Sequence, residues 1–374
     1  MNLRALFRHI LSGREGARYE QRRPGEMQKE KLNTYPQPAI FADAHGVAAM
    51  NDKAQALFPR IKPGDALPDA LIPPEGEQIW EGAACMDGRV YQTRCEQQEQ
   101  GYLYTFQPKE QLALSDGQLD GALYQLRTLM SEFQRELGAC ISGEKEHLSE
   151  EDKAHFARTF DRQLRLMDHL DFLRDVKDNA VWLDMTEVEL GLLCSKVALE
   201  CDGLLREMGI RVEYLGLPVS VFVRGDEGRL RDALTELISN CARRRAKGGR
   251  ITIELKRRGR QAMICVTDDG DEPTPGQRLT MTNRGTMPLI PTPDMGAGLG
   301  LSVAERTMWL HDGALLISSG AGAPRVYLSL GTCTPTGKME VHSCKMERNP
   351  GRNPYVIALS DVLPGYIVRE DWKE

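Results

Sequence analysis

The spacing of apolar residues changes several times along the chain and divides it into zones. Between residues 115 and 178 apolar residues recur every three or four positions, which predicts two helices that each carry one apolar seam. A polar break at 142–146 separates them, and a capping signal at 149–152 begins the second. Because two helices alone cannot bury both seams, the pattern favours a hairpin that dimerises into a four-helix bundle.

Short apolar runs and turns fill residues 35–106 instead. The run 39–42 ends at a polar turn, and 89–95 and 102–106 predict a hairpin around the polar residues 96–101. Asn51 is expected to start a short helix. This zone is therefore predicted to be a small, strand-rich domain.

The order of elements is mixed from residue 186 to about 330. A capping box at 186–189 predicts a helix to about Met208, and helices are also predicted at 226–245 and 299–310. Strands are predicted near Val212 and at 221–223, 250–255, 262–266, 315–318 and 326–330. The pattern implies an α/β sandwich with helices on one face of a mixed sheet. Beyond it, 355–359 predicts one more strand and 337–353 a loop.

Composition narrows the functional classes. With 374 residues, 41% hydrophobic and 27% charged, the chain is globular and long enough for two or three domains. The net charge of −6 is mixed along the sequence, so no basic surface for nucleic acid is expected. The nine cysteines never form a Cys-x-x-Cys pair, which argues against a zinc site or a disulfide framework.

The N-terminal region, residues 1–33, is locally basic. No apolar run reaches about 20 residues and no secretory signal is present, so a cytoplasmic location without a transmembrane segment is expected. Apolar residues at helical spacing near the start could rest on a membrane surface or a partner helix. A solvated tail is the preferred interpretation.

Three short clusters of residues in the third zone have the composition of a ligand-binding site. The segment 234–240 lies late in a helix, 266–270 follows a strand, and 296–301 opens a helix. Glycines at a helix start leave backbone N–H groups open to phosphate oxygens. An asparagine oxygen can help hold Mg²⁺, and Asp268 can accept a hydrogen bond from an exocyclic amine. Together the clusters predict a nucleotide site.

Two other phosphate-binding motifs do not fit. A dinucleotide fold needs a strand directly before the glycines, and the two prolines in 289–294 exclude one. A Walker-type loop is absent, because no Gly-Lys-Ser/Thr follows a glycine-rich run.

On these clusters, residues 183–332 resemble the ATP-binding domain of sensor histidine kinases and their gyrase-like relatives. The resemblance implies ATP and Mg²⁺ as cofactors, with Asn240 at the magnesium position and Asp268 at the adenine-recognising position. It further implies a long ATP lid at 271–295. The resemblance makes Gly270 the first glycine after the aspartate and places Gly296, Gly298 and Gly300 beside the phosphates. Arg243 stands in place of a phosphate-side lysine. Glu236 stands where many kinases have Asn and where gyrase-like ATPases have a water-activating carboxylate.

One departure concerns the phosphate side. The aspartate box continues as Gly270-Asp271-Glu272, which places two carboxylates near the expected polyphosphate. Like charge there should weaken nucleotide binding unless cations compensate.

The helical zone, 115–180, then resembles the dimerisation and phosphotransfer hairpin of these kinases. Its segment 124–130 matches the family's His-Glu-Leu-Arg-Thr-Pro-Leu at Leu126, Arg127 and Thr128, but Tyr124 stands where the phosphoacceptor histidine should be. A phenol with a pKa of about 10 is a poor nucleophile at neutral pH, which argues against phosphoryl transfer here. Thr128 occupies the position of a residue that assists hydrolysis of a partner's phosphoaspartate.

Residues 34–110 loosely resemble a PAS sensor domain. The expected fold class is α+β: this PAS-like domain, a two-helix hairpin forming a dimeric four-helix bundle, an α/β sandwich ATP-binding domain of the histidine kinase/gyrase type, and a C-terminal extension at 333–374.

The leading hypothesis is a degenerate histidine kinase of a two-component system. It would form a homodimer and act through a response regulator or a partner kinase. Three alternatives stay open: an active kinase using a displaced histidine, a scaffold with a vestigial nucleotide site, and, ranked lowest, a gyrase-like ATPase using Glu236. The displaced histidines considered are His147, His155 and His169.

Overall fold

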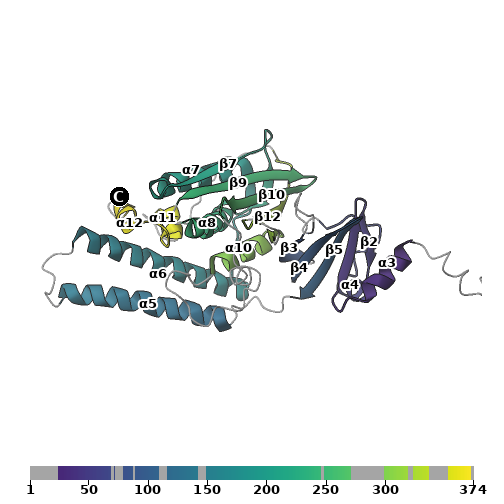
Figure 1. Cartoon of the computed structure of the whole chain (residues 1–374), viewed down its shortest axis with the longest axis horizontal. Coiled ribbons are helices and arrows are strands. Elements are labelled where there is room, and N and C mark those ends of the chain that lie inside the picture. Colours follow the sequence, from purple (N-terminus) through teal and green to yellow (C-terminus); the bar gives the residue numbers. More distant parts are fainter. Residues whose placement is uncertain are drawn as a thin grey trace, which may run out of the picture. The chain divides into compact units, whose positions relative to one another are not determined.

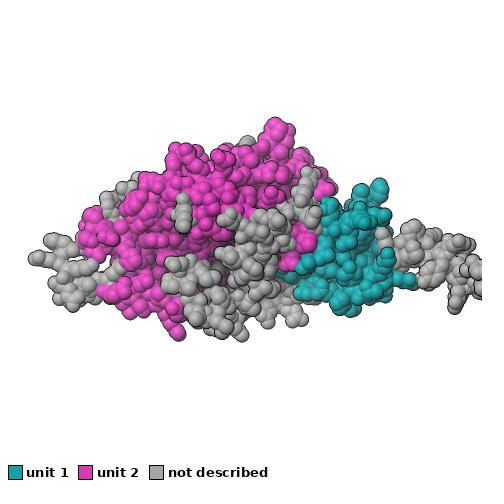
Figure 2. Space-filling view, in the orientation of Figure 1, with its two compact units in different colours: residues 1–68, 92–108 teal, residues 69–91, 109–374 magenta. Residues whose placement is uncertain are grey.

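The computed structural model describes residues 24–68, 71, 79–86, 89–108, 116–141, 149–245, 248–270, 299–318, 323–336 and 353–371. The chain divides into two compact units, coloured separately in Figure 2. Unit 1 is Met1–Pro68 with Gln92–Pro108, and unit 2 is Asp69–Tyr91 with Lys109–Glu374. Among the helices of the described residues, none is both long and apolar enough to cross a bilayer. The basic segment before residue 24 lies outside the described residues.

Unit 1 is a small antiparallel sheet with two helices. Its strand order is β2-β1-β5-β4, with β4 contributing from residue 92 onward. The side chain of Asn51 is fully buried, caps α4 by accepting from the Ala54 N–H at 2.8 Å, and also accepts from the Ala39 N–H at 3.0 Å. The predicted helix start at Asn51 is confirmed. The elements are α3 (Pro24–Asn33), β1 (Ala39–Asp43), β2 (Gly46–Met50), α4 (Asp52–Leu57), β4 (Arg89–Gln98) and β5 (Gly101–Pro108).

Unit 2 contains a larger mixed sheet in the order β3-β11-β12-β10-β9-β7, in which only β7 and β9 run parallel. A separate pair, β6 and β8, is antiparallel. The strands are β3 (Ile79–Met86), β6 (Thr186–Glu189), β7 (Ile210–Leu215), β8 (Phe222–Gly225), β9 (Gly249–Arg258), β10 (Gln261–Asp268), β11 (Ala314–Ser318) and β12 (Val326–Gly331).

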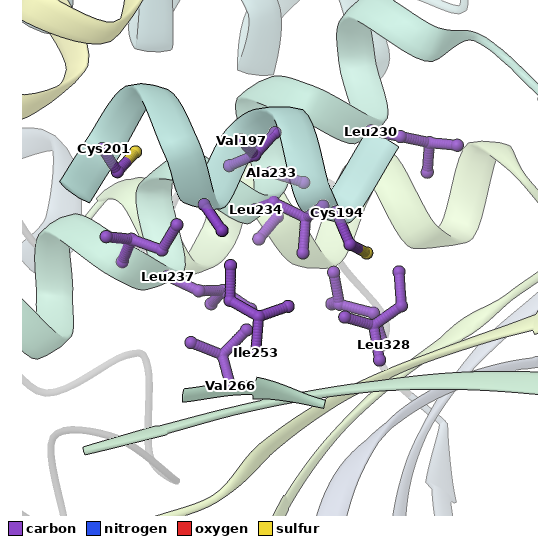
Figure 3. Close-up of a cluster of buried hydrophobic side chains, with 14 of the residues drawn as sticks. Cys194, Val197, Cys201, Leu230, Ala233, Leu234, Leu237, Ile253, Val266 and Leu328 are labelled. Carbon is purple, nitrogen blue, oxygen red and sulfur yellow. The ribbon is translucent and has the colours of Figure 1, made fainter. Parts of the chain in front are cut away.

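Helices cover one face of this sheet, as the sandwich prediction requires (Figure 1). They are α7 (Leu190–Leu205), α8 (Glu227–Arg244) and α10 (Leu299–Leu310). Their apolar sides meet the strands in one buried cluster: Val197 from α7, Leu234 and Leu237 from α8, and Ile253 and Leu328 from the sheet (Figure 3). The predictions for α8, α10 and strands β9 to β12 are confirmed.

Two sequence-based predictions are wrong. Residues 186–189 form strand β6 rather than the first turn of a helix, because they pair with β8. The helix begins later, at Leu190, and Glu189 caps it by accepting from the N–H groups of Gly191 and Leu192.

The expected strand at 355–359 is instead helix α11 (Pro354–Leu359). Asn353 caps it by accepting from the Tyr355 N–H at 2.9 Å, and Pro354 occupies its first turn, where a missing N–H costs nothing. Val356 and Leu359 are buried in the main core, and this burial outweighs the strand propensity of the segment. A second short helix, α12 (Gly365–Asp371), follows.

The predicted helices of the hairpin are present as α5 (Asp116–Ile141) and α6 (Glu150–Lys177), which lie side by side in Figure 1. The ring centres of Phe133 on α5 and Phe156 on α6 are 4.7 Å apart. Ser149 forms the predicted capping box with Asp152 at the start of α6. The polar break lies outside the described residues. Leu166, Phe172 and Leu173 of α6 also share a cluster with the start of α10.

Strand β3 is an element that the sequence analysis missed. It falls in the range expected for the PAS-like domain, yet it pairs antiparallel with β11 in unit 2. A side chain at Gly82 could not fit, because its Cβ would lie 2.2 Å from the Leu315 carbonyl oxygen. Strand β3 therefore belongs to unit 2.

Candidate functional site

Helix α8 carries the central side chains of the site. Asp226 caps its start by accepting from the Arg229 N–H at 3.0 Å. One side of the helix is buried in the core, while Glu236, Asn240 and Arg243 follow one another at intervals of four and three residues and so share a face. Basic residues in the last turn suit the negative end of the helix dipole.

Glu236 is held by two side chains of α6. Its oxygens lie 2.6 Å from Arg165 Nη2 and 2.9 Å from His169 Nε2, and the residue is only 3% exposed. Burial by itself would raise the pKa of Glu236, but the charges of Arg165 and His169 outweigh it and lower the pKa to about 2. A general base works best with a pKa near the working pH, so a lowered pKa disfavours Glu236 in that role.

Gly300 lies directly against this carboxylate. A Cβ at position 300 would be 2.2 Å from Glu236 Oε2, so only glycine allows α10 to begin at this distance from α8. Gly300 thus has a packing role beside Glu236. Gly296, Gly298 and the loop 271–295 lie outside the described residues.

Asp268 ends strand β10 and is 6% exposed. Its Oδ1 accepts from the Gly270 N–H at 2.9 Å, and its Oδ2 accepts from Arg244 Nε at 3.0 Å and pairs with Arg244 Nη2. Both carboxylate oxygens therefore already have donors. A ligand amine can use Oδ2 only after Arg244 moves.

The three arginines that end α8 serve three different acceptors. Arg243 donates to the Asn240 side chain, Arg244 binds Asp268, and Arg245 Nε lies 3.1 Å from Asp269. Sequence reasoning singled out only Arg243. The signal that it overlooked was the uninterrupted run of three arginines at 243–245, which begins three residues after Asn240.

The three sequence clusters come together around α8. Glu236 contacts the start of α10 at Gly300, and two turns later Arg244 contacts the end of β10 at Asp268, with Asn240 between them. These groups fit a nucleotide: an amide oxygen for a hydrated metal, a carboxylate for a base amine, and arginines for phosphates. Among the described residues, no cluster of His, Cys, Asp or Glu forms a metal site by itself.

Tyr124 and Thr128 of α5 form their hydrogen bond with each other and not with the residues of α8. Tyr124 is 47% exposed on α5, and the Thr128 hydroxyl donates to the Tyr124 carbonyl oxygen at 3.0 Å. That bond stays within the helix, so neither residue is joined to α8.

Sequence reasoning also missed Asp361 and most of a cationic row on α6. The row has helical spacing and consists of Arg158, Arg162, Arg165 and His169. Arg165 contacts both Glu236 and Asp361, and only His169 had been considered, as a displaced phosphoacceptor. The spacing of the row was visible in the sequence, but its partners were not.

Known proteins resemble the chain in the same region. Residues 225–334 match the family described as histidine kinase-, DNA gyrase B- and HSP90-like ATPase. Sporulation kinase C of Bacillus subtilis is 33% identical over 28% of this chain and 24% of its own length. The adaptive-response sensory kinase SasA of Parasynechococcus marenigrum is 27% identical over 53% of each. The chain thus covers only a quarter to a half of these two relatives.

Solved structures align with a larger part of the chain. The Acinetobacter baumannii histidine kinase AdeS aligns with 56% of this chain and 98% of its own, at 18% identity and a TM-score of 0.46. Histidine kinase ThkA in complex with response regulator protein TrrA aligns with 79% and 96%, at 14% identity and a TM-score of 0.41. On the family match, the chain carries a histidine kinase-type ATP-binding domain.

Proposed function

We propose that this chain is a degenerate histidine kinase of a two-component system. It binds Mg²⁺–ATP at the α8 cluster and acts on a response regulator or a partner kinase without phosphorylating its own hairpin at the usual position. The observation that carries this proposal is the meeting of Glu236, Asn240 and Asp268 with Gly300 around one helix of a histidine kinase-type domain.

Each residue of the cluster has a task in nucleotide binding. The Asn240 amide oxygen would help hold a hydrated Mg²⁺, Arg243 would face the phosphates, and Asp268 would accept from the adenine amine. Gly270 keeps the chain close to Asp268, and Gly300, with the expected Gly296 and Gly298, would leave backbone N–H groups open to phosphate oxygens.

The hairpin supports a regulatory rather than a self-phosphorylating role. Tyr124 replaces the attacking imidazole, and a phenol stays protonated at neutral pH. The apolar side chains of Leu123, Met130 and Met167 are 39%, 48% and 52% exposed, which leaves surface for a second hairpin in a homodimer. Thr128 keeps the position from which a polar side chain would assist hydrolysis of a partner's phosphoaspartate. Unit 1 would serve as the PAS-like sensor.

Nucleotide binding can be tested by calorimetry with Mg²⁺–ATP. We expect the wild type to bind with a Kd below about 1 mM, and Asp268→Asn to weaken binding about tenfold or more, because the acceptor of the adenine amine loses its charge. Asp269→Asn is the matched control, since this neighbouring carboxylate is half exposed. The absence of any binding by the wild type would leave only the scaffold alternative.

Autophosphorylation can be tested with ATP labelled on its γ-phosphate. We expect no acid-labile, base-stable phosphate on the chain, because Tyr124 cannot replace histidine and because His169 is bonded to Glu236 and only 13% exposed at its side chain. Labelling of that kind would instead support a displaced histidine, and His169→Gln and His155→Gln would then identify which one.

A further inference from the structure

The turn between α11 and α12 brings an acidic residue to the cationic row of α6. Asp361 lies 2.8 Å from Arg162 Nε and 2.7 Å from Arg165 Nη1. Arg158 donates to the backbone carbonyl oxygens of Ser360 at 3.2 Å and Asp361 at 3.0 Å. Three arginines of one helix thus contact a single turn of the C-terminal extension.

Arg165 connects this turn to the candidate site. Its guanidinium group binds Glu236 of α8 through Nε and Nη2 while Nη1 binds Asp361, and the residue is 7% exposed. One buried cation therefore joins the hairpin, the ATP-binding domain and the C-terminal extension. Removing one partner from such a buried cluster leaves an uncompensated charge, which is unfavourable. Each of the three segments therefore helps to keep the other two in place.

Asp361 also acts on the arginine expected at the phosphates. Burial lowers the pKa of Arg243, and the negative charges of Asp361 and Glu236 oppose that effect. Burial would raise the pKa of Asp361, but Arg165, Arg162 and Arg243 outweigh it and hold the pKa well below its ordinary value. Asp361 is therefore an anion held by arginines of α6, one of which, Arg165, also binds Glu236 of the candidate site.

We propose that the C-terminal segment 353–371 is an internal inhibitor of the nucleotide site: Asp361, anchored by Arg162, occupies Arg165 beside Glu236 in place of a nucleotide phosphate, and this contact holds α6 against α8. The inference rests on the proposed function, because it assigns a regulation to the same site. Nucleotide and the C-terminal segment then compete, and each weakens the binding of the other to the same extent.

The decisive variant is Asp361→Asn, with Glu207→Gln as its matched control. Glu207 also binds the C-terminal segment, accepting from the Tyr366 hydroxyl at 2.8 Å, and the control removes the same charge without touching the arginines. Calorimetry with Mg²⁺–ATP should give a Kd at least fivefold lower for Asp361→Asn and within twofold of wild type for Glu207→Gln. Saturating Mg²⁺–ATP should raise amide hydrogen exchange of residues 353–371 in the wild type.

A second variant separates competition from simple electrostatic attraction. Arg162→Gln weakens the same contact from the α6 side, but it removes a positive charge, and this loss by itself would weaken the attraction of ATP. Tighter ATP binding in both Asp361→Asn and Arg162→Gln supports the inhibitor. Far-ultraviolet circular dichroism confirms that the variants are folded.

The outcomes distinguish the two proposals. If wild type and both variants bind Mg²⁺–ATP equally well, or if only Asp361→Asn binds more tightly, the inhibitor is overturned while the nucleotide site stands. If neither the wild type nor Asp361→Asn binds Mg²⁺–ATP, the proposed function fails and the inhibitor fails with it.

Discussion

Glu236 illustrates how the surroundings of one side chain decide its chemistry. The same position in a solvated cleft would be an ordinary carboxylate, but here it is buried against Arg165 and His169, and a Cβ at Gly300 would collide with it. It serves as a structural anion that fixes the start of α10 against α8. Its depressed pKa gives a stability signature that can be measured.

Acid should destabilise the fold through this residue. The pKa of Glu236 falls from its ordinary 4.5 to about 2 on folding, so its stabilising contribution is complete above pH 4.5 and is lost as the pH drops through 2. The contribution is about 3 kcal/mol at neutral pH. Urea unfolding between pH 7 and pH 2 should therefore show a smaller loss of stability for Glu236→Gln, relative to its own value at pH 7, than for the wild type. Identical pH dependence in both proteins would contradict this prediction.

At the residue scale, the sequence predicts the positions of the site better than its contacts. Glu236, Asn240 and Asp268 stand late in a helix or at the end of a strand, where periodicity locates them. Their partners cannot be found this way, because Arg165 lies 71 positions from Glu236 and 196 from Asp361. Helical spacing identifies the faces of α6 but not which other element each face meets.

At the scale of elements, long periodic segments are predicted well and short ones are not. Helices α8 and α10 follow from their apolar spacing and from turn signals at their ends. The segment that forms α11 has β-branched and aromatic residues typical of a strand, and only its cap and its burial in the core decide for a helix. Tertiary contacts thus override local propensity where an element spans fewer than two turns.

The packing of α12 on α6 can be tested with a glycine-to-alanine substitution, which adds one methyl group. A Cβ at Gly365 would lie 2.5 Å from the Ala154 carbonyl oxygen, so Gly365→Ala should push α12 away from α6 and raise amide hydrogen exchange in residues 353–371. Gly203→Ala is the control, because that position lies within α7 and has open space around it. The control should stabilise the protein by about 0.5–1 kcal/mol. Unchanged exchange in Gly365→Ala would show that the C-terminal helix does not depend on this contact.

At the scale of the whole molecule, the two helices of the hairpin leave part of their apolar surface uncovered. Its helices bury one another only in part, and exposed apolar side chains remain along both of them. The sequence pattern anticipated this, because seams of this length need more than two helices. The proposed homodimer would supply the missing pair.

Light scattering after size-exclusion chromatography can test this assembly. We expect a molar mass of two chains, and we expect the double variant Met130→Lys with Met167→Lys to run as a single chain, because buried lysines would be left without partners. Leu199→Lys on α7 is the control, since Leu199 is equally apolar and 72% exposed but lies outside the hairpin. A wild-type mass of one chain would contradict the homodimer.

The pairing of β3 with β11 has a consequence for how the protein is made. During synthesis on the ribosome, residues 79–86 emerge long before residues 314–318, so β3 must wait without this neighbour while most of the chain is still being translated. An apolar strand with an open edge can join the wrong partner in the meantime. Nascent chains arrested before residue 314 should therefore recruit chaperones more strongly than chains released at full length.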